Sequence, residues 1–177
     1  MPAVTLEQLL ESRDRRAAHQ KDLLGAHPGK SLLCLTVQLP GPEKRNARSL
    51  AIAQAGVEAI RTAFPADYEE LRDLETGYEA YFLLSVPAAE AKRRACRLED
   101  THPLGRLMDI DVLPGGTGNL QPLSRSDIGL PPRRCLLCGQ PARYCMRART
   151  HSREELLAQI DKMLETYELS GTYTGTD

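Results

Sequence analysis

The order of the predicted elements favours an α+β fold with a mostly antiparallel sheet. Between residues 31 and 113 the apolar pattern alternates in the order strand, helix, strand, strand, helix, strand. This order matches a split β-α-β unit, and further helices flank it at both ends. A nucleotidyltransferase-like α/β arrangement is the alternative. Because the chain has 177 residues, we expect a single domain over residues 1–169 and a disordered tail over residues 170–177.

Local signals mark the ends of these elements. Thr5 can cap the first helix, and a Pro-Gly-Pro run at 40–42 closes the first strand. Ser152 and Glu155 have the spacing of a capping box, which predicts the start of the last helix. We expect helices over 6–24, 48–64, from 87 onward and over 152–168, and strands over 31–39, 68–74, 78–86 and 105–113.

The overall charge is close to neutral, with 23 Lys and Arg against 24 Asp and Glu. A nucleic-acid binder of the usual kind needs a basic excess, so this class is excluded. No apolar run approaches the roughly 20 residues that span a bilayer, and the start has no basic leader followed by an apolar run. We therefore expect a cytoplasmic protein without membrane contact, whose five cysteines are thiols or metal ligands rather than disulfides.

An Asp-x-Asp pair stands in the last predicted strand. Asp109 and Asp111 should leave one face of that strand, while its apolar residues point to the other. Two carboxylates roughly 7 Å apart repel each other, which favours a divalent cation between them. Mg²⁺ is the natural candidate because it also accepts water and phosphate oxygens. The alternative is a half-exposed strand whose two Asp are ordinary surface residues.

The residues before this strand are further candidates. Arg106 offers a forked donor to phosphate, and Gly105 lets backbone approach a ligand closely. His102 is either a proton-transfer group on a turn or a surface histidine. The sequence does not identify a third carboxylate for a metal; Glu99 and Asp127 are the candidates.

A cysteine-rich segment follows the strand. Cys135 and Cys138 have C-x2-C spacing, and Cys145 and His151 complete four ligands of the types that hold zinc. The alternatives are reduced thiols, some of them buried, or a redox pair. The segment is also the main basic concentration, which indicates a discrete polyanion such as a nucleotide polyphosphate, or an acidic partner surface. Its arginines are Arg133, Arg134, Arg143, Arg147, Arg149 and Arg153.

Two long motifs carry a resemblance to a known family. The run HPLGRLMDIDV from His102 to Val112 and the run LPPRRCLLC from Leu130 to Cys138 resemble the apo-citrate lyase phosphoribosyl-dephospho-CoA transferases, also called holo-citrate lyase synthases. The early run LLESRDRR and the strand before the Pro-Gly-Pro turn are similar too, so the resemblance extends from about residue 6 to about residue 165. Met108 departs from the pattern, since an aromatic residue is expected there.

The resemblance implies a transferase domain that takes 2′-(5″-triphosphoribosyl)-3′-dephospho-CoA. Its phosphoribosyl-dephospho-CoA part would be linked to a Ser of the citrate lyase acyl carrier protein, the gamma subunit, with release of pyrophosphate. Asp109 and Asp111 would hold Mg²⁺, and one of them or His102 would accept the Ser proton. The residues expected to bind the phosphates are Gly105, Arg106, Arg133 and Arg134.

Two alternatives accompany this interpretation. One is the same transfer to the malonate decarboxylase carrier protein. The other is a non-catalytic, zinc-stabilised module that binds a carrier protein, in which the Asp pair is ordinary surface. The early arginines Arg13, Arg15 and Arg16 are expected to form a solvated helix face, with docking of an acidic carrier protein as the alternative.

Overall fold

The computed structural model describes residues 3–116 and 120–170. Its strands are β1 (Ser31–Val37), β2 (Ala66–Leu74), β3 (Gly77–Leu84) and β4 (Met108–Leu113). Its α-helices are α1 (Leu6–Ala26), α2 (Ala47–Ala63), α3 (Ala88–Thr101), α4 (Ala142–Ala148) and α5 (Arg153–Leu169). Two short 3₁₀ turns are η1 (Gly105–Leu107) and η2 (Ser126–Ile128).

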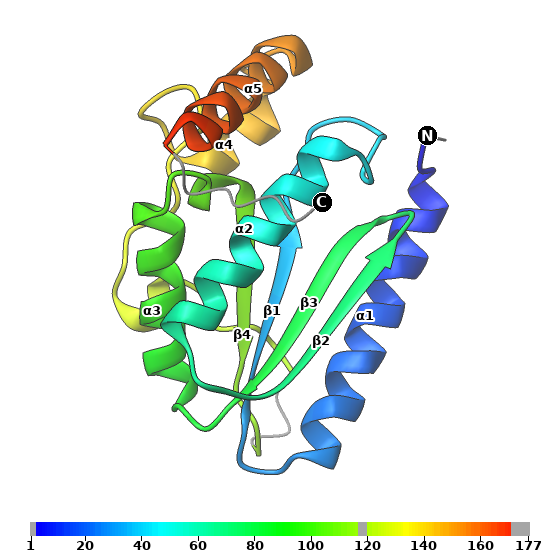
Figure 1. Cartoon of the computed structure of the whole chain (residues 1–177), viewed down its shortest axis with the longest axis vertical. Coiled ribbons are helices and arrows are strands. Elements are labelled where there is room, and N and C mark those ends of the chain that lie inside the picture. The colour runs from blue at the N-terminus through cyan, green and yellow to red at the C-terminus, as the bar shows by residue number, and fades with distance from the viewer. Residues whose placement is uncertain (1–2, 117–119, 171–177) are drawn as a thin grey trace.

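The four strands form one sheet in the order β2-β3-β1-β4, and every neighbouring pair is antiparallel (Figure 1). β1 and β2 therefore run in the same direction with β3 between them. β3 and β4 are related in the same way, with β1 between them. These are two split β-α-β units connected through α2 and α3, so the predicted α+β fold is confirmed.

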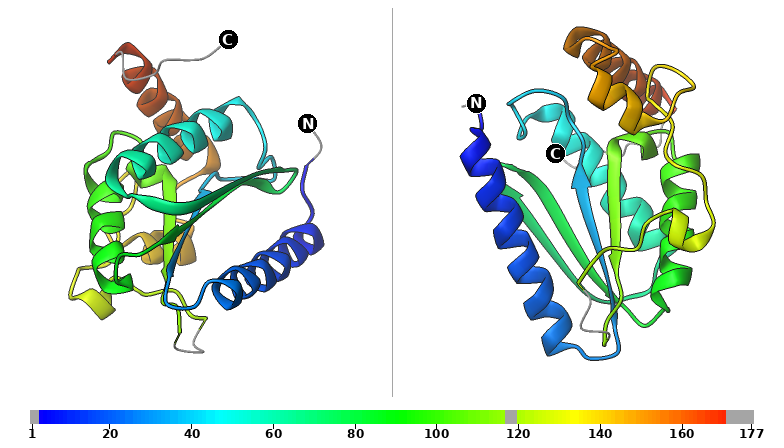
Figure 2. Two further views of the ribbon diagram at one scale, coloured as in Figure 1. Left: turned by 60° about the horizontal axis from the view of Figure 1, so that its bottom comes forward. Right: turned by 180° about the vertical axis from the view of Figure 1, so that it is seen from behind.

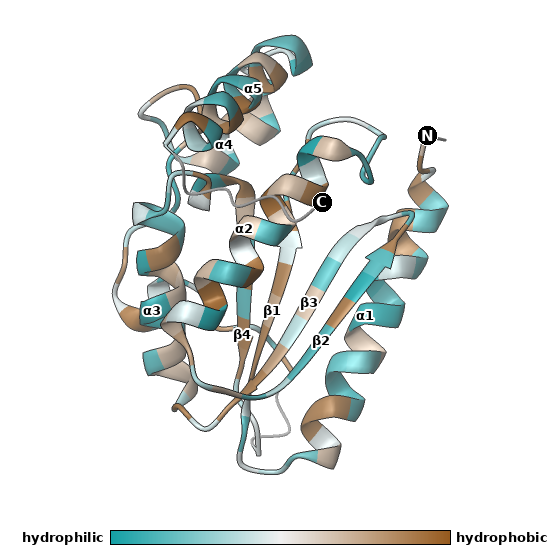
Figure 3. Ribbon diagram, in the orientation of Figure 1, coloured by the Kyte–Doolittle hydropathy of each residue, from teal (hydrophilic) through white to brown (hydrophobic). Residues whose placement is uncertain are grey.

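Different helices cover the two faces of the sheet (Figure 2). α2 and α3 pack on one face, where Leu33, Phe82 and Ile110 belong to the larger apolar core. α1 packs on the other face through Leu23 and Leu24, which join a smaller cluster. The rest of α1 is largely hydrophilic (Figure 3), so only part of this second face is closed by apolar contacts.

α4 and α5 lie beyond the end of the sheet where β1 finishes and β4 begins (Figure 1). The apolar side of α5 reaches the larger core through Ile160, Leu164 and Tyr167. Arg48 of α2 forms an ion pair with Asp161 of α5. The cysteine-rich segment is therefore held between the sheet and a helix that belongs to the core.

The predicted elements agree with the structure within a few residues, with two differences. The strand expected from 105 begins at Met108, because residues 105–107 form η1 against the end of α3. A Cβ at Gly105 would lie 2.6 Å from the carbonyl oxygens of Leu98 and Glu99, so this contact needs a glycine. α4 was not expected, because its seven residues show too little apolar periodicity.

No helix among the described residues is both long and apolar enough to cross a membrane. The single domain over 1–169 remains a prediction. Residues 171–177 of the expected tail lie outside the described residues.

Candidate functional site

Asp109 and Asp111 lie on one face of β4, as their spacing predicted. Both are partly exposed, whereas the residues that alternate with them are buried. On β1 the register partner of Asp109 is Thr36, and that of Asp111 is Cys34. Thr36 is also paired with Glu79 on β3. Because partners in register share a face, the sheet aligns a third carboxylate with the pair.

The local charges at this pair suit a cation. Burial raises the pKa of Asp111, and the negative charge of Asp109 raises it further, against the opposing effect of Lys92, Arg16 and Arg133. Arg133 donates from Nη1 to Oδ1 of Asp109 over 3.3 Å. Paired carboxylates of this kind, with hard oxygen donors, fit Mg²⁺.

Two buried side chains of α3 fix the peptide between the aspartates. Lys92 Nζ donates to the carbonyl oxygen of Ile110 over 2.9 Å, and the Ile110 N–H donates to Glu99 Oε1 over 3.0 Å. Burial raises the pKa of Glu99, while the Arg133 charge and this N–H bond lower it. Because β4 is an edge strand, the N–H and carbonyl groups of Ile110 have no neighbouring strand to pair with, and these two bonds satisfy them. α3 therefore positions Asp109 and Asp111 from the outer side of the sheet.

Asp109 lines a pocket of about 700 Å³, a size typical of ligand sites. α1, the loop after β1 and the segment from 135 to 160 enclose it. Its basic lining residues are Arg13, Arg16, Lys44, Arg106, Arg149 and Arg153, and its acidic lining residues are Glu79 and Asp109. Because basic residues outnumber acidic ones, the lining favours an anionic ligand. Only the two carboxylates on the sheet would repel it.

The early arginines have different surroundings. Arg15 faces solvent, where it pairs with Glu11 one turn away. Arg16 lines the pocket, and its Nη1 lies 3.4 Å from Oε1 of Glu79. Arg13 also lines the pocket. α1 therefore turns two of its three early arginines towards the same space as Asp109.

The predicted phosphate-binding residues lie in different places. Arg106 lines the pocket and donates to the carbonyl oxygen of Arg134. Arg133 is half-buried and donates to Asp109 and to the carbonyl oxygen of Met108. The side chain of Arg134 is exposed and does not line the pocket. Gly105 packs against α3, and its close contact there explains the glycine without a ligand.

His102 lies apart from the aspartates. It follows the last residue of α3, where Nδ1 accepts a hydrogen bond from the Leu104 N–H over 3.0 Å. Its ring centroid is 5.4 Å from that of Tyr167, and burial lowers its pKa. It lines a separate hollow with Glu58 and Tyr167. The structure therefore does not bring His102 to the pair that it was expected to assist.

The four predicted zinc ligands do come together. One ligand atom from each of Cys135, Cys138, Cys145 and His151 lies within 4.8 Å of all the others. Cys138 Sγ and Cys145 Sγ are 3.6 Å apart, close to the roughly 3.7 Å between two thiolates on one tetrahedral zinc. Nε2 of His151 is buried and has no hydrogen-bond partner in the part of the chain that is described. The group can hold one metal ion.

The fold of this segment explains the convergence. Hydrogen bonds between Cys135 and Gln140 and between Arg133 and Ala142 close a turn that carries Cys135 and Cys138. Cys145 lies on α4, and Arg149 caps the end of that helix with a left-handed φ of 49°. This residue turns the chain back towards His151 and also lines the pocket beside Asp109.

The same turn favours thiolate at one ligand. Burial acts to raise the pKa of Cys135, but hydrogen bonds from the backbone N–H groups of Leu137 and Cys138, together with those from the Cys145 and Cys138 thiols, lower the pKa to about 7. A thiolate is the form of cysteine that binds metal.

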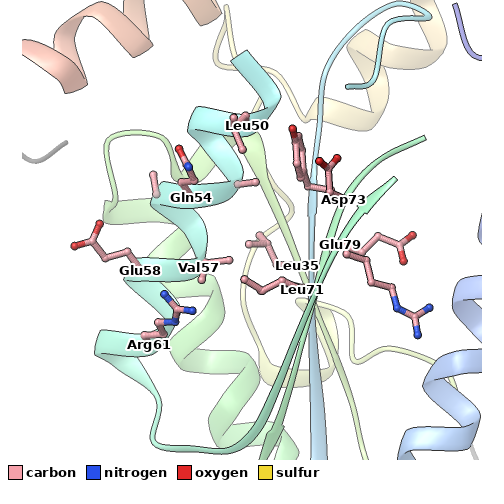
Figure 4. Close-up of a pocket in the computed structure, with 14 residues that line it drawn as sticks. Leu35, Leu50, Gln54, Val57, Glu58, Arg61, Leu71, Asp73 and Glu79 are labelled. Carbon is pink, nitrogen blue, oxygen red and sulfur yellow. The ribbon is translucent and has the colours of Figure 1, made fainter. Parts of the chain in front are cut away.

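A second pocket of about 590 Å³ lies on the opposite face of the sheet, between α2 and the strands β2 and β3 (Figure 4). Leu35, Leu50 and Leu71 point into it, whereas Glu79 extends away from it (Figure 4). Two of its charged lining residues already have partners: Arg61 pairs with Glu69 and Asp73 pairs with Arg45. We therefore locate the candidate site at the first pocket.

Sequence reasoning missed two parts of this site. Glu79 and Lys44 line the pocket, yet neither stands near the Asp pair in sequence. Arg153 also lines the pocket, and it belongs to the basic segment that was expected to meet a polyanion. Glu79 had a weak signal, because it is an acidic residue beside an apolar strand run. The candidates Glu99 and Asp127 have other partners: Glu99 is held by the Ile110 N–H, and Asp127 accepts from the Ser124 N–H over 2.8 Å.

Comparison with known proteins identifies one family to which the chain is similar. Residues 4–167 match the model of a family described as apo-citrate lyase phosphoribosyl-dephospho-CoA transferase. A protein of Streptococcus pyogenes serotype M18, named as a probable member, is 40% identical over 168 residues, which cover 93% of this chain and 88% of that protein. The Shigella boydii transferase is 40% identical over 167 residues, which cover 92% of this chain and 89% of the relative.

A longer Haemophilus influenzae protein, named Protein CitXG, is 37% identical over 172 residues, which cover 94% of this chain and 36% of that protein. The family match spans the Asp pair, the cysteine-rich segment and the arginines of α1. The resemblance found in the sequence motifs is thereby confirmed, and the chain belongs to the apo-citrate lyase phosphoribosyl-dephospho-CoA transferase family.

Proposed function

We propose that the chain transfers phosphoribosyl-dephospho-CoA from 2′-(5″-triphosphoribosyl)-3′-dephospho-CoA to a Ser of the citrate lyase acyl carrier protein. The Ser oxygen forms a bond to the α-phosphorus of the triphosphate, the bond from that phosphorus to the bridging oxygen of the β-phosphate breaks, and pyrophosphate leaves. The observation that carries this proposal is a single pocket in which carboxylates on a sheet face a largely basic lining. Such a pocket matches a substrate with several phosphate groups and a metal.

Asp109 and Asp111 are the residues that would hold Mg²⁺. When bound, the ion would neutralise charge on the triphosphate and on the leaving pyrophosphate. The clamp formed by the hydrogen bonds from Lys92 and to Glu99 holds the Ile110 backbone, and with it the strand that carries both carboxylates. Since His102 lies in another hollow, we assign acceptance of the Ser proton to one of the two aspartates.

Arg106 and Arg133 are the proposed partners of the triphosphate. Arg106 lines the pocket, and Arg133 already meets Asp109. Burial lowers the pKa of Arg106, and the charges of Arg133 and Arg125 lower it further, so these cations crowd one another. An anion placed between them would relieve that repulsion.

We also propose that the three cysteines and His151 hold a structural zinc ion. All four positions are filled by protein ligands, which is typical of structural rather than catalytic zinc. Metal analysis of protein purified without chelator should find one zinc per chain. Cys138→Ser should lose it, and Cys96→Ser, on α3 outside the group, should keep it. Cobalt substitution should give the visible spectrum of a tetrahedral thiolate site; equal zinc in both variants would exclude the assignment.

The transfer is tested by a mass spectrum of the apo carrier protein before and after reaction with substrate and Mg²⁺. Asp109→Asn and Asp111→Asn should each lower the rate at least about 100-fold in folded protein. Asp14→Asn, an exposed aspartate of α1, is the matched control and should react normally. If both aspartate variants of β4 keep near wild-type rates, the metal assignment is wrong.

The same assay separates the carrier proteins. The family and its named relatives point to citrate lyase. A side-by-side reaction with the malonate decarboxylase carrier protein should give no product within the time that labels the citrate lyase protein. Preferential labelling of the malonate decarboxylase protein would reverse the choice of acceptor.

A further inference from the structure

Three cations from three different elements line the pocket. Arg13 comes from α1, Lys44 from the loop between β1 and α2, and Arg153 from the first residue of α5. All three line the same pocket as Asp109. Within the described part of the chain, none of the three forms an ion pair with a carboxylate. This differs from Arg16 and Arg133, whose partners are Glu79 and Asp109.

The three charges are close enough to affect one another. Burial lowers the pKa of Lys44, and the positive charges of Arg13 and Arg153 lower it further, with no acidic residue opposing them. Lys44 Nζ donates to the carbonyl oxygen of Leu39 over 2.5 Å, which holds the ammonium group in the loop. Like charges that are held together without a counter-ion cost free energy, and a bound anion would recover it.

The loop beneath Arg153 is shaped to receive it. Gly41 has a φ of 90°, and a Cβ there would lie 2.5 Å from Nε and 2.6 Å from Cζ of Arg153. The guanidinium group therefore rests on a position that only glycine leaves open. Two residues earlier in the chain, His151 belongs to the cysteine-histidine group, so the start of α5 is fixed from both sides.

The three cations are distinguished from the other basic residues by their electrostatic neighbours. Arg16 and Arg133 both lower the pKa of Asp111, whereas no carboxylate acts on the pKa of Lys44. The proposed substrate carries two separate anionic groups, the triphosphate on the added ribose and the diphosphate of the dephospho-CoA part. Arg and Lys side chains can bind a diphosphate ester directly, whereas the proposed Mg²⁺ would be shared with the reacting triphosphate.

We propose that Arg13, Lys44 and Arg153 form a second anion subsite, which binds the diphosphate of the dephospho-CoA part. This inference rests on the proposed transfer. The subsite would hold the end of the substrate that does not react, so its contribution is to binding and orientation rather than to the chemical step. It also accounts for three basic lining residues that form no ion pair with a carboxylate within the described residues.

Direct binding tests the subsite without catalysis. Dephospho-CoA, which lacks the triphosphoribosyl group, should bind the wild-type protein in calorimetry without Mg²⁺. Lys44→Gln and Arg153→Gln should each weaken this binding about 10-fold or more. Arg15→Gln, two residues from Arg13 on the solvent side of α1, should bind like the wild type. Thermal unfolding of each variant checks that the loss is not one of folding.

Kinetics with two substrates gives the second readout. The two variants should raise KM for the full substrate about 10-fold with little change in kcat. A truncated substrate, triphosphoribosyl-adenosine without the diphosphate and pantetheine, should react equally with wild type and variants. If KM for the carrier protein rises instead, the three cations form a docking surface and the subsite is excluded.

The outcomes also separate this inference from the proposed transfer. Normal binding of dephospho-CoA in both variants overturns the subsite even if transfer is confirmed. Loss of binding in the variants, retained in Asp109→Asn, supports the subsite even if another acceptor is found for the transferred group. Equal weakening of dephospho-CoA binding by Asp109→Asn would place the diphosphate at the carboxylates and overturn the inference.

Discussion

The strand β4 shows the two faces of the sheet side by side. Ile110 and Val112 are fully buried against α2 and α3, while Asp109 and Asp111 on the opposite face remain partly exposed. The buried face contributes apolar burial to the stability of the fold. The other face keeps charges whose repulsion and desolvation oppose folding. Alternate residues of β4 therefore contribute to stability on one face and to the candidate site on the other. Substitutions on the buried face should lower the free energy of unfolding, whereas neutralising a charge on the other face should raise it.

The largest effect on folding is expected from the buried face. Phe82→Ala removes a fully buried ring at the centre of the larger core and should lower the free energy of unfolding by about 3–5 kcal/mol. Chemical denaturation measures the change. If this variant does not fold, Ile110→Val provides a milder test, with a loss of about 0.5–1.5 kcal/mol. In the fraction that folds, the transfer rate should stay within a few-fold of wild type. A loss of rate as large as that of Asp109→Asn would show that the buried face also contributes to catalysis.

The clamp on Ile110 connects the two faces and should give an intermediate effect. Glu99→Gln keeps an acceptor for the Ile110 N–H but removes a buried negative charge beside Arg125 and Arg133. We expect a loss of about 1–3 kcal/mol in unfolding free energy, together with a higher Mg²⁺ concentration for half-maximal rate.

The matched control for this clamp is Glu90→Gln on the same helix. Its partner Arg94 is one turn away and both side chains are exposed, so the change should stay within about 0.5 kcal/mol. If Glu99→Gln changes stability but not the Mg²⁺ requirement, the clamp supports the strand without positioning the aspartates.

Features that depend on local sequence pattern could be predicted from the sequence. The period of apolar residues gave most elements, and alternation placed Asp109 and Asp111 on one face. The C-x2-C spacing also identified ligands that meet in space. The register between β1 and β3, which brings Glu79 level with Asp109, depends on pairing that sequence distance does not reveal.

Other parts of the pocket wall also depend on contacts between residues that are distant in sequence. Lys44 and Arg153 are more than 100 residues apart and meet only because α5 packs beyond the end of β1. His102 shows the opposite case, since it stands close to the Asp pair in sequence but turns into another hollow after α3. Proximity along the chain was thus informative within one strand and misleading across a helix end.

The smallest expected effect is a gain in stability, on replacing Asp111 by Asn. Burial and the charge of Asp109 raise the pKa of Asp111 in the folded state, so the folded protein binds this proton more readily than the unfolded chain does. The ionised carboxylate therefore lowers stability above its folded pKa, and the penalty is relieved as the pH falls through that value. Asp111→Asn should unfold at higher denaturant concentration than the wild type at pH 7, without Mg²⁺ present.

The pH dependence makes the last prediction specific. The stability advantage of Asp111→Asn should shrink as the pH is lowered, because a protonated Asp111 is as neutral as the amide that replaces it. Asp14→Asn, at an exposed position on α1, controls for the general effect of removing a carboxylate. Urea denaturation of the three proteins over a pH series measures the differences. An advantage that is independent of pH, or a variant less stable than wild type at pH 7, would mean that packing at position 111 outweighs its charge, and the polar face would then contribute to stability as the buried face does.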